Sequence, residues 1–119
     1  TPHLSFSWLD LHRLSDYALD TADLQPLMLT LADDLGRQNL ALSQALDSGA
    51  DAQTLHQILH ALKGMAGLFA VPAIQVALTR ADDACRQGQW ASGATLARSV
   101  QPALNMWEQE VGLWLQRYS

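Results

Sequence analysis

Residues 51–70, DAQTLHQILHALKGMAGLFA, carry the clearest periodic pattern of the chain. Successive residues of an α-helix are rotated by about 100°, so residues three and four apart share one face. On that basis seven apolar residues fall on one face with no polar residue among them: Leu55, Ile58, Leu59, Leu62, Met65, Ala66 and Phe69. The opposite face carries Gln53, His56, Gln57, His60, Lys63, Gly64 and Gly67. The pattern predicts a helix over about residues 52–70, capped by Asp51, with His60 pointing away from a core.

Two helices are expected before this stretch. Residues 6–19 form a short amphipathic pattern typical of an N-terminal helix. A long helix follows and ends near Asp47. Pro26 is compatible with its first turn if the helix begins at Asp23, because first-turn amides have no intrahelical partner. The candidate N-caps are Asp20, Thr21 and Asp23, and the expected core stripe is Leu27, Leu31, Leu35, Leu42 and Leu46.

Two further helices are expected after it. Pro72 opens a helix that closes near Gly88. A last helix covers roughly residues 91–118, with a kink at Pro102, because proline cannot donate the usual helical hydrogen bond. Its expected apolar side comprises Leu104, Trp107, Val111, Trp114 and Leu115.

Short linkers between long helices favour antiparallel neighbours. The sequence therefore predicts an all-α fold: an up-down antiparallel four-helix bundle over about residues 21–118 with an additional short N-terminal helix. No strand pattern, repeat or internal boundary is visible, so residues 1–119 are expected to form a single domain.

Composition excludes several classes of function. The net charge is −5 with only seven Lys and Arg among 119 residues, which argues against nucleic-acid binding and against a polybasic membrane-surface helix. No apolar run approaches the ~20 residues of a membrane span. The single cysteine, Cys85, fits a reducing compartment and is expected to be a small apolar residue on a helix and not a reactive thiol. We therefore expect a cytoplasmic domain. Because the chain opens Thr1-Pro2 without a methionine, we also expect a segment of a longer protein or a processed terminus.

The face opposite the core is where the chemistry is expected. Gly64 and Gly67 follow His60 on that face, although glycine inside a helix costs about 1 kcal/mol relative to alanine. Because these glycines have no side chains, the helix surface beside His60 is flat, and a partner can approach the imidazole closely. Lys63, three residues after His60, can offset negative charge there. A neutral imidazole nitrogen can attack an acyl phosphate, and the resulting phosphoramidate remains reactive.

The segment His60-Ala61-Leu62-Lys63-Gly64-Met65-Ala66 resembles the motif of histidine phosphotransfer (HPt) domains, in which histidine precedes x-Leu-Lys-Gly and small residues. Residues 81–88, ADDACRQG, are similar to the family's Leu-Glu-x-Ala-x-Arg-x-Gly. The resemblance covers about residues 6–118. The departures are Met65 in place of a small residue, Ala70 where many members have glycine, Ala81 in place of leucine and Asp82 in place of glutamate.

The resemblance implies a phosphoryl carrier in a two-component phosphorelay. His60 would accept a phosphoryl group from a receiver-domain aspartate and pass it to a response-regulator aspartate. Lys63, Gln57 and Arg86 would support the phosphoryl group, while His56, Gly64 and Gly67 would lie in the docking surface. The receivers would supply Mg²⁺, so no cofactor is expected on this chain, nor any kinase activity of its own. The expected setting is the C-terminal module of a bacterial hybrid sensor kinase of the inner membrane.

Two alternatives remain open. The first is an HPt-like module that docks a protein without transferring phosphate. The second is a helical metal-binding bundle, because His56 and His60 have the i, i+4 spacing of a metal pair. Gln57 stands where a metalloprotease motif requires glutamate, so no metal site is expected, and His56 is interpreted as a solvated neighbour. The adjacent acidic pairs, Asp33-Asp34 and Asp82-Asp83, are likewise interpreted as solvated.

Overall fold

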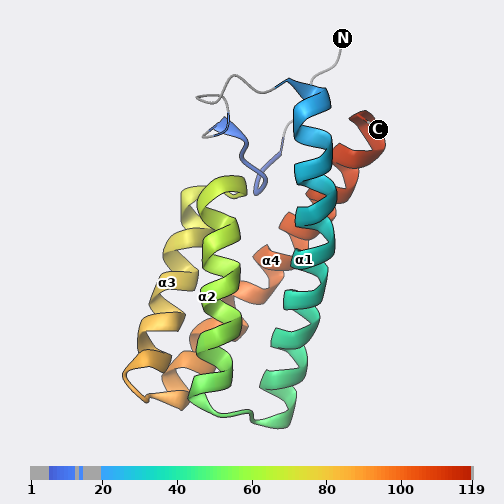
Figure 1. The fold of residues 1–119 in the computed structure, drawn as a ribbon. Coiled ribbons are helices and arrows are strands. Elements are labelled where there is room, and N and C mark those ends of the chain that lie inside the picture. Colours follow the sequence, from blue (N-terminus) through green and yellow to red (C-terminus); the bar gives the residue numbers. More distant parts are fainter. Residues whose placement is uncertain (1–5, 13, 15–19, 119) are drawn as a thin grey trace.

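Four α-helices follow one another in the computed structural model, which describes residues 6–12, 14 and 20–118. They are α1 (Thr21–Ser48), α2 (Ala52–Phe69), α3 (Pro72–Arg86) and α4 (Trp90–Tyr118). The chain runs up and down through them, and α4 also packs against α1, which closes the bundle (Figure 1). The predicted all-α four-helix bundle is confirmed. No helix in the described part of the chain is long and apolar enough to cross a membrane.

Acidic N-caps start the first two helices. The Asp20 side chain accepts a hydrogen bond from the Asp23 amide at 2.8 Å, and the Asp23 carboxylate accepts one from the Asp20 amide at 3.2 Å, which makes a reciprocal capping box. Asp51 caps α2 as expected. Of the three candidate N-caps, Asp20 is the one that caps α1. Because α1 begins at Thr21 and not at Asp23, Pro26 lies in the second turn. Pro26 is exposed, so water can replace the missing helical donor.

The core lies where the apolar stripes meet. Every apolar residue predicted for the inner face of α2 is buried or packs half-buried against the core. In α1 the predicted stripe is correct except at its first residue: Leu27 is 41% exposed, and Met28 is fully buried instead. The other predicted residues, Leu31, Leu35, Leu42 and Leu46, are buried. Met28, Leu35 and Leu42 are spaced by seven residues and therefore lie on one face of α1. The side chain of Leu27 is rotated by about 100° from that of Met28. In α4 the predicted core residues are buried or half-buried. This helix continues through the exposed Pro102, and the change of direction expected there stays a prediction.

The predicted N-terminal α-helix is wrong over residues 6–11. His12 and Leu14 have 3-10 helical geometry, with the Leu14 amide donating to the Leu11 carbonyl at 3.0 Å, and residues 13 and 15–19 lie outside the described part. Leu9 instead forms an isolated antiparallel bridge with Ala70, in the turn between α2 and α3. The Asp10 amide donates to the Phe69 carbonyl at 3.0 Å, and the Val71 amide donates to the Trp8 carbonyl at 2.9 Å. This pairing requires extended backbone, so the segment crosses the end of the bundle as a strap (Figure 1).

A buried acid on α4 completes the attachment of this segment. Glu110 is only 8% exposed, and its carboxylate accepts backbone hydrogen bonds from Ser7, Trp8 and Leu9 at 3.3, 2.8 and 2.9 Å. A carboxylate removed from water requires such donors, because burying it unpaired is costly. Apolar spacing alone cannot reveal this pairing, which joins residues about a hundred positions apart in the sequence.

Helices α3 and α4 approach each other closely at Gly93. A Cβ atom at this position would overlap the sulfur of Cys85 and lie 3.4 Å from the Cys85 backbone nitrogen. Cys85 is buried, and burial together with the charge of Asp82 raises the pKa of its thiol. Cys85 lies on helix α3, as expected, and its burial is a finding of the structure.

We expect Gly93→Ala to lower the free energy of unfolding by roughly 1–2 kcal/mol, because overpacking outweighs the gain in helix propensity. Gly112→Ala is the matched control on the same helix, since no heavy atom lies within 4 Å of its added Cβ. The control should gain up to about 1 kcal/mol. Urea unfolding of both variants measures the difference, and equal shifts of the same sign would contradict the packing argument.

Candidate functional site

His60 occupies the middle of the outward face of α2. Its side chain is exposed, as predicted, and it makes no hydrogen bond or ion pair with the other described residues. Its imidazole ring lies 5.7 Å from that of His56, one helical turn earlier, measured between ring centroids, with the planes tilted by 41°. His60 therefore presents an exposed imidazole to a partner that docks on this face, and no hydrogen bond or ion pair with another described residue engages its ring nitrogens.

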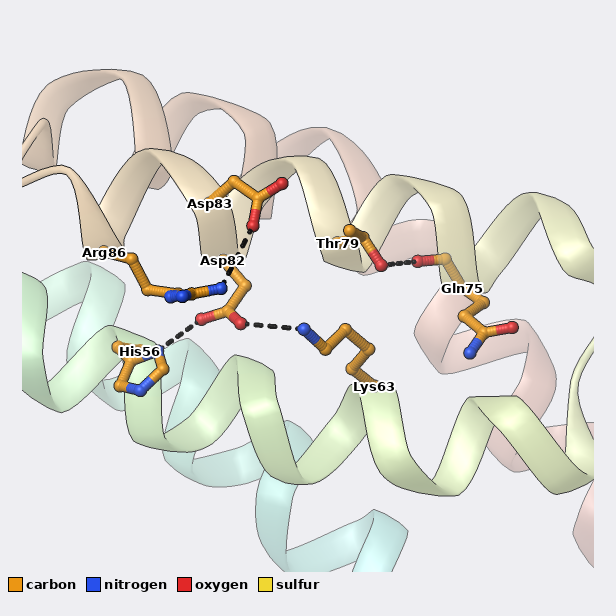
Figure 2. Close-up of polar contacts among 7 residues, drawn as sticks. All are labelled: His56, Lys63, Gln75, Thr79, Asp82, Asp83 and Arg86. Carbon is orange, nitrogen blue, oxygen red and sulfur yellow. Dashed lines mark hydrogen bonds and ion pairs between the residues drawn. The ribbon is translucent and has the colours of Figure 1, made fainter.

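Beneath this face lies a buried carboxylate contributed by α3. Asp82 is completely inaccessible to solvent, and its two oxygens contact different residues of α2. Oδ1 lies 2.5 Å from His56 Nδ1, and Oδ2 accepts a hydrogen bond from Lys63 Nζ at 3.1 Å (Figure 2). His56 and Lys63 are seven residues apart and therefore share a side of α2, so one carboxylate reaches both. The three side chains form a polar cluster across the α2–α3 interface.

The electrostatics of the cluster keep Asp82 ionised. Burial alone would raise the pKa of this carboxyl, but the hydrogen bonds from His56 and Lys63, and the charges of those groups, lower the pKa below its ordinary value. An ionised carboxylate only accepts hydrogen bonds, so His56 Nδ1 must carry the proton that it donates to Asp82. The hydrogen-bond network thus assigns the His56 tautomer and leaves Nε2 without a proton when the ring is neutral.

Two sequence interpretations are corrected by this cluster. Asp82 is not part of a solvated acidic pair, because its neighbours in the helical register are the core residues Leu78 and Cys85. Asp83 next to it points outward, as expected, and pairs at 3.7 Å with Arg86. His56 is not a solvated neighbour either, since its side chain is only 27% exposed and is held by Asp82. Asp82 shares the helical register of the buried residues of α3, and this register could have predicted the burial of Asp82 from the sequence.

The remaining predicted residues are distributed over the same face and its border. Gln57 and Gly64 are exposed on α2, and Gly67 is half-buried. Lys63 reaches α3 through Asp82, with 23% of its side chain exposed. Arg86 lies at the end of α3 in an exposed ion pair, which contributes little to stability. The structure thus joins His56 and Lys63 through Asp82 and places His60 beside His56. The functional roles assigned to all of these residues, and to Gln57 and Arg86, stay predictions.

A metal centre finds little support in this arrangement. Among residues 6–12, 14 and 20–118, no group of three or more His, Cys, Asp and Glu side chains could hold a metal ion. His56 Nδ1 is already bonded to Asp82.

Comparison with known proteins agrees with the geometry. The model of the Hpt domain family matches residues 24–114, which covers all of α2 and α3 and most of α1 and α4. The chain belongs to the Hpt domain family. It is therefore a phosphotransfer carrier of two-component signalling, and domains of this family interact with receiver domains in phosphorelays. The chain has no match among curated proteins or among solved structures.

The lowered pKa of Asp82 makes stability depend on pH in a defined direction. The unfolded chain binds a proton at this carboxyl near the ordinary pKa of 3.8, before the folded chain does. The stabilisation is therefore fully present above about pH 5 and is lost as the pH falls through the lower pKa of the folded state. We expect Asp82→Asn to lower the free energy of unfolding by about 3 kcal/mol near pH 7, and the difference from the native chain to shrink below about pH 4.

Asp83→Asn is the matched control for this measurement, because it removes the adjacent exposed carboxylate. Its effect should stay within about 0.5 kcal/mol across the same pH range. Urea unfolding at several pH values provides the comparison. A constant difference between Asp82→Asn and the native chain from pH 7 to pH 3 would contradict the assignment of a buried, ionised Asp82.

Proposed function

We propose that His60 is the phosphoryl-carrying residue of this domain. It accepts the group from a phospho-aspartate of one receiver domain and passes it to the aspartate of a second. The observation that carries the proposal is an exposed imidazole at the centre of α2, inside the range that matches the Hpt family, with no hydrogen bond or ion pair to the other described residues. A carrier needs such a group, because both donor and acceptor must reach the same nitrogen in line with the phosphorus.

The chemical step demands little from this chain. A neutral nitrogen of His60 attacks phosphorus, the bond between phosphorus and the acyl oxygen breaks, and its electron pair stays on the departing aspartate. The receiver supplies Mg²⁺, an acidic pocket and a lysine to stabilise the phosphoryl group in flight. One of the three N–H groups of Lys63 Nζ donates to Asp82, so the other two are available to donate to a phosphoryl group nearby.

The backbone beside His60 supports access by a protein partner. No heavy atom lies within 4 Å of the place that a Cβ on Gly64 would occupy, so packing within this chain does not require glycine there. Its conformation does not require glycine either, because its φ is that of an ordinary helical residue. The remaining reason is the space that a docked receiver needs above α2.

The proposal extends to the setting of the domain. In the simplest relay of this kind, a hybrid sensor kinase supplies one receiver and a response regulator supplies the other. Both partners imply a bacterial protein and a cytoplasmic setting. The support is the family's interaction with receiver domains. The same chemistry also runs in reverse, so the net direction follows from the partners and not from this chain.

Replacing His60 by glutamine should abolish relay through this chain. The side chain of glutamine preserves hydrogen bonding but has no nucleophilic nitrogen, so transfer to a second receiver should fall to the rate seen without this protein. The measurement uses ³²P-labelled receiver, native chain or variant, and a second receiver. His12→Gln, a change at another exposed histidine, is the matched control and should relay like the native chain.

The outcome distinguishes a phosphoryl carrier from a docking module that does not transfer phosphate. Label that reaches the second receiver through the native chain and not through His60→Gln establishes the carrier. Binding of receivers by both proteins, with no relay through either, would favour a docking module without phosphotransfer. Undiminished relay through His60→Gln would refute the proposal.

Gly64→Ala tests the proposed docking surface. Alanine should raise the free energy of unfolding by about 0.5–1 kcal/mol through helix propensity, because nothing in the chain opposes its methyl group. It should nevertheless slow phosphoryl transfer, because the methyl group stands where the receiver approaches His60. Gly112→Ala, on α4, should stabilise the chain similarly without slowing transfer. Equal transfer rates for both variants would show that the receiver does not use this surface.

A further inference from the structure

We propose that His56 is a second phosphoryl acceptor, whose Nε2 is prepared as a nucleophile by the buried carboxylate of Asp82. The inference rests on the proposed function, because it takes the donor to be the same phospho-aspartate that serves His60. Its basis is the polar cluster of His56, Asp82 and Lys63, in which His56, and not His60, has the carboxylate partner.

The tautomer of His56 is the first argument. Because Nδ1 donates to Asp82 at 2.5 Å, the neutral ring has its free electron pair on Nε2. Figure 2 shows this second ring nitrogen directed away from Asp82. The side chain is held in one orientation while 27% of it remains exposed. A fixed orientation of a nucleophilic nitrogen reduces the entropy lost on reaching the transition state.

Charge is the second argument. When Nε2 forms a bond to phosphorus, the ring keeps its proton on Nδ1 and becomes cationic. An adjacent carboxylate stabilises that cation, as the aspartate of a Ser-His-Asp triad stabilises its imidazolium. Asp82 is shielded from solvent, so its interaction with the ring is weakly screened. Lys63 holds the other oxygen of Asp82 and keeps the carboxylate ionised and in place. Within the described residues, His60 has no such partner.

Proximity is the third argument. The rings of His56 and His60 are 5.7 Å apart, so a receiver that delivers a phosphoryl group to one places it within a few ångströms of the other. Both residues lie one turn apart on the outward side of α2. A donor docked on this face therefore meets two imidazoles, the more exposed His60 and the carboxylate-bound His56.

The step balances without a further reagent. The electron pair of His56 Nε2 forms the bond to phosphorus, and the bond between phosphorus and the acyl oxygen of the donor breaks. Its electrons remain on the donor's aspartate, which leaves as a carboxylate. The proton on Nδ1 stays between His56 and Asp82 throughout.

Labelling of single and double variants tests the proposal. The native chain, His60→Gln, His56→Gln and the double variant are treated with phosphoramidate, a small phosphoryl donor, and separately with a phosphorylated receiver. Peptide mass spectrometry then locates the label. We expect acid-labile phosphate on His56 in the native chain and in His60→Gln, and none on residues 52–69 of the double variant. Long-range ¹H–¹⁵N spectra of the untreated chain should show His56 with its proton on Nδ1.

The role of Asp82 is tested in the His60→Gln background. Adding Asp82→Asn should reduce label on His56 by about tenfold or more, the size expected for losing a hydrogen bond to a charged group. Adding Asp83→Asn, a change at the neighbouring exposed carboxylate, should leave the label unchanged. If the Asp82 variant fails to fold, the single and double histidine variants still decide the question.

The outcomes distinguish this inference from the proposed function. Label confined to His60 in the native chain, with none on His56 in any protein, overturns the inference and leaves the proposed function standing. Label on His56, with His60 never labelled and relay intact in His60→Gln, refutes the proposed function and supports the inference. Absence of label from both histidines with both donors refutes both.

Discussion

The carboxylate of Asp82 has no contact with solvent, yet it is ionised in the interface between α2 and α3. Burial of a charge is tolerated only where partners replace its hydration, and here α2 supplies both of them, His56 and Lys63. Because these partners are seven residues apart, the two helices must keep one register and one rotation for both contacts to form. That constraint turns the polar side of α2 into a fixed surface with His60 at its centre.

The site is an open helix face and not an enclosed cavity, which suits a protein that hands a group between two larger partners. The proposed mechanism leaves most of the electrostatic stabilisation of phosphoryl transfer to the receivers. In the proposed mechanism this chain contributes the exposed imidazole of His60, the bare backbone at Gly64 and the ammonium of Lys63 held by Asp82. Glycine in the helix costs about 1 kcal/mol of stability relative to alanine, and the proposed docking surface gives a functional reason to accept that cost.

Two buried acids join parts of the chain that lie far apart in the sequence. Asp82 connects α3 to α2, and Glu110 connects α4 to the backbone amides of residues 7–9. In both cases a carboxylate takes its hydrogen bonds from a different segment. The Glu110 contact, together with the pairing of residues 8–10 with residues 69–71, explains why residues 8–10 are extended and not helical. An apolar pattern that fits a helix also fits an extended segment that packs half-buried on the end of a bundle.

The sequence by itself determined the number, order and approximate bounds of the four long helices, because apolar spacing, caps and Pro or Gly breaks are local properties. It also determined the outward position of His60, which follows from the register of α2 alone. Only the tertiary structure decided the partners of the polar residues: Asp82 with His56 and Lys63, and Glu110 with the N-terminal segment. The physical reason is that the helical register determines which way a side chain points. The hydrogen-bond donors that a buried carboxylate contacts come from other elements, and the packing of those elements depends on the whole chain.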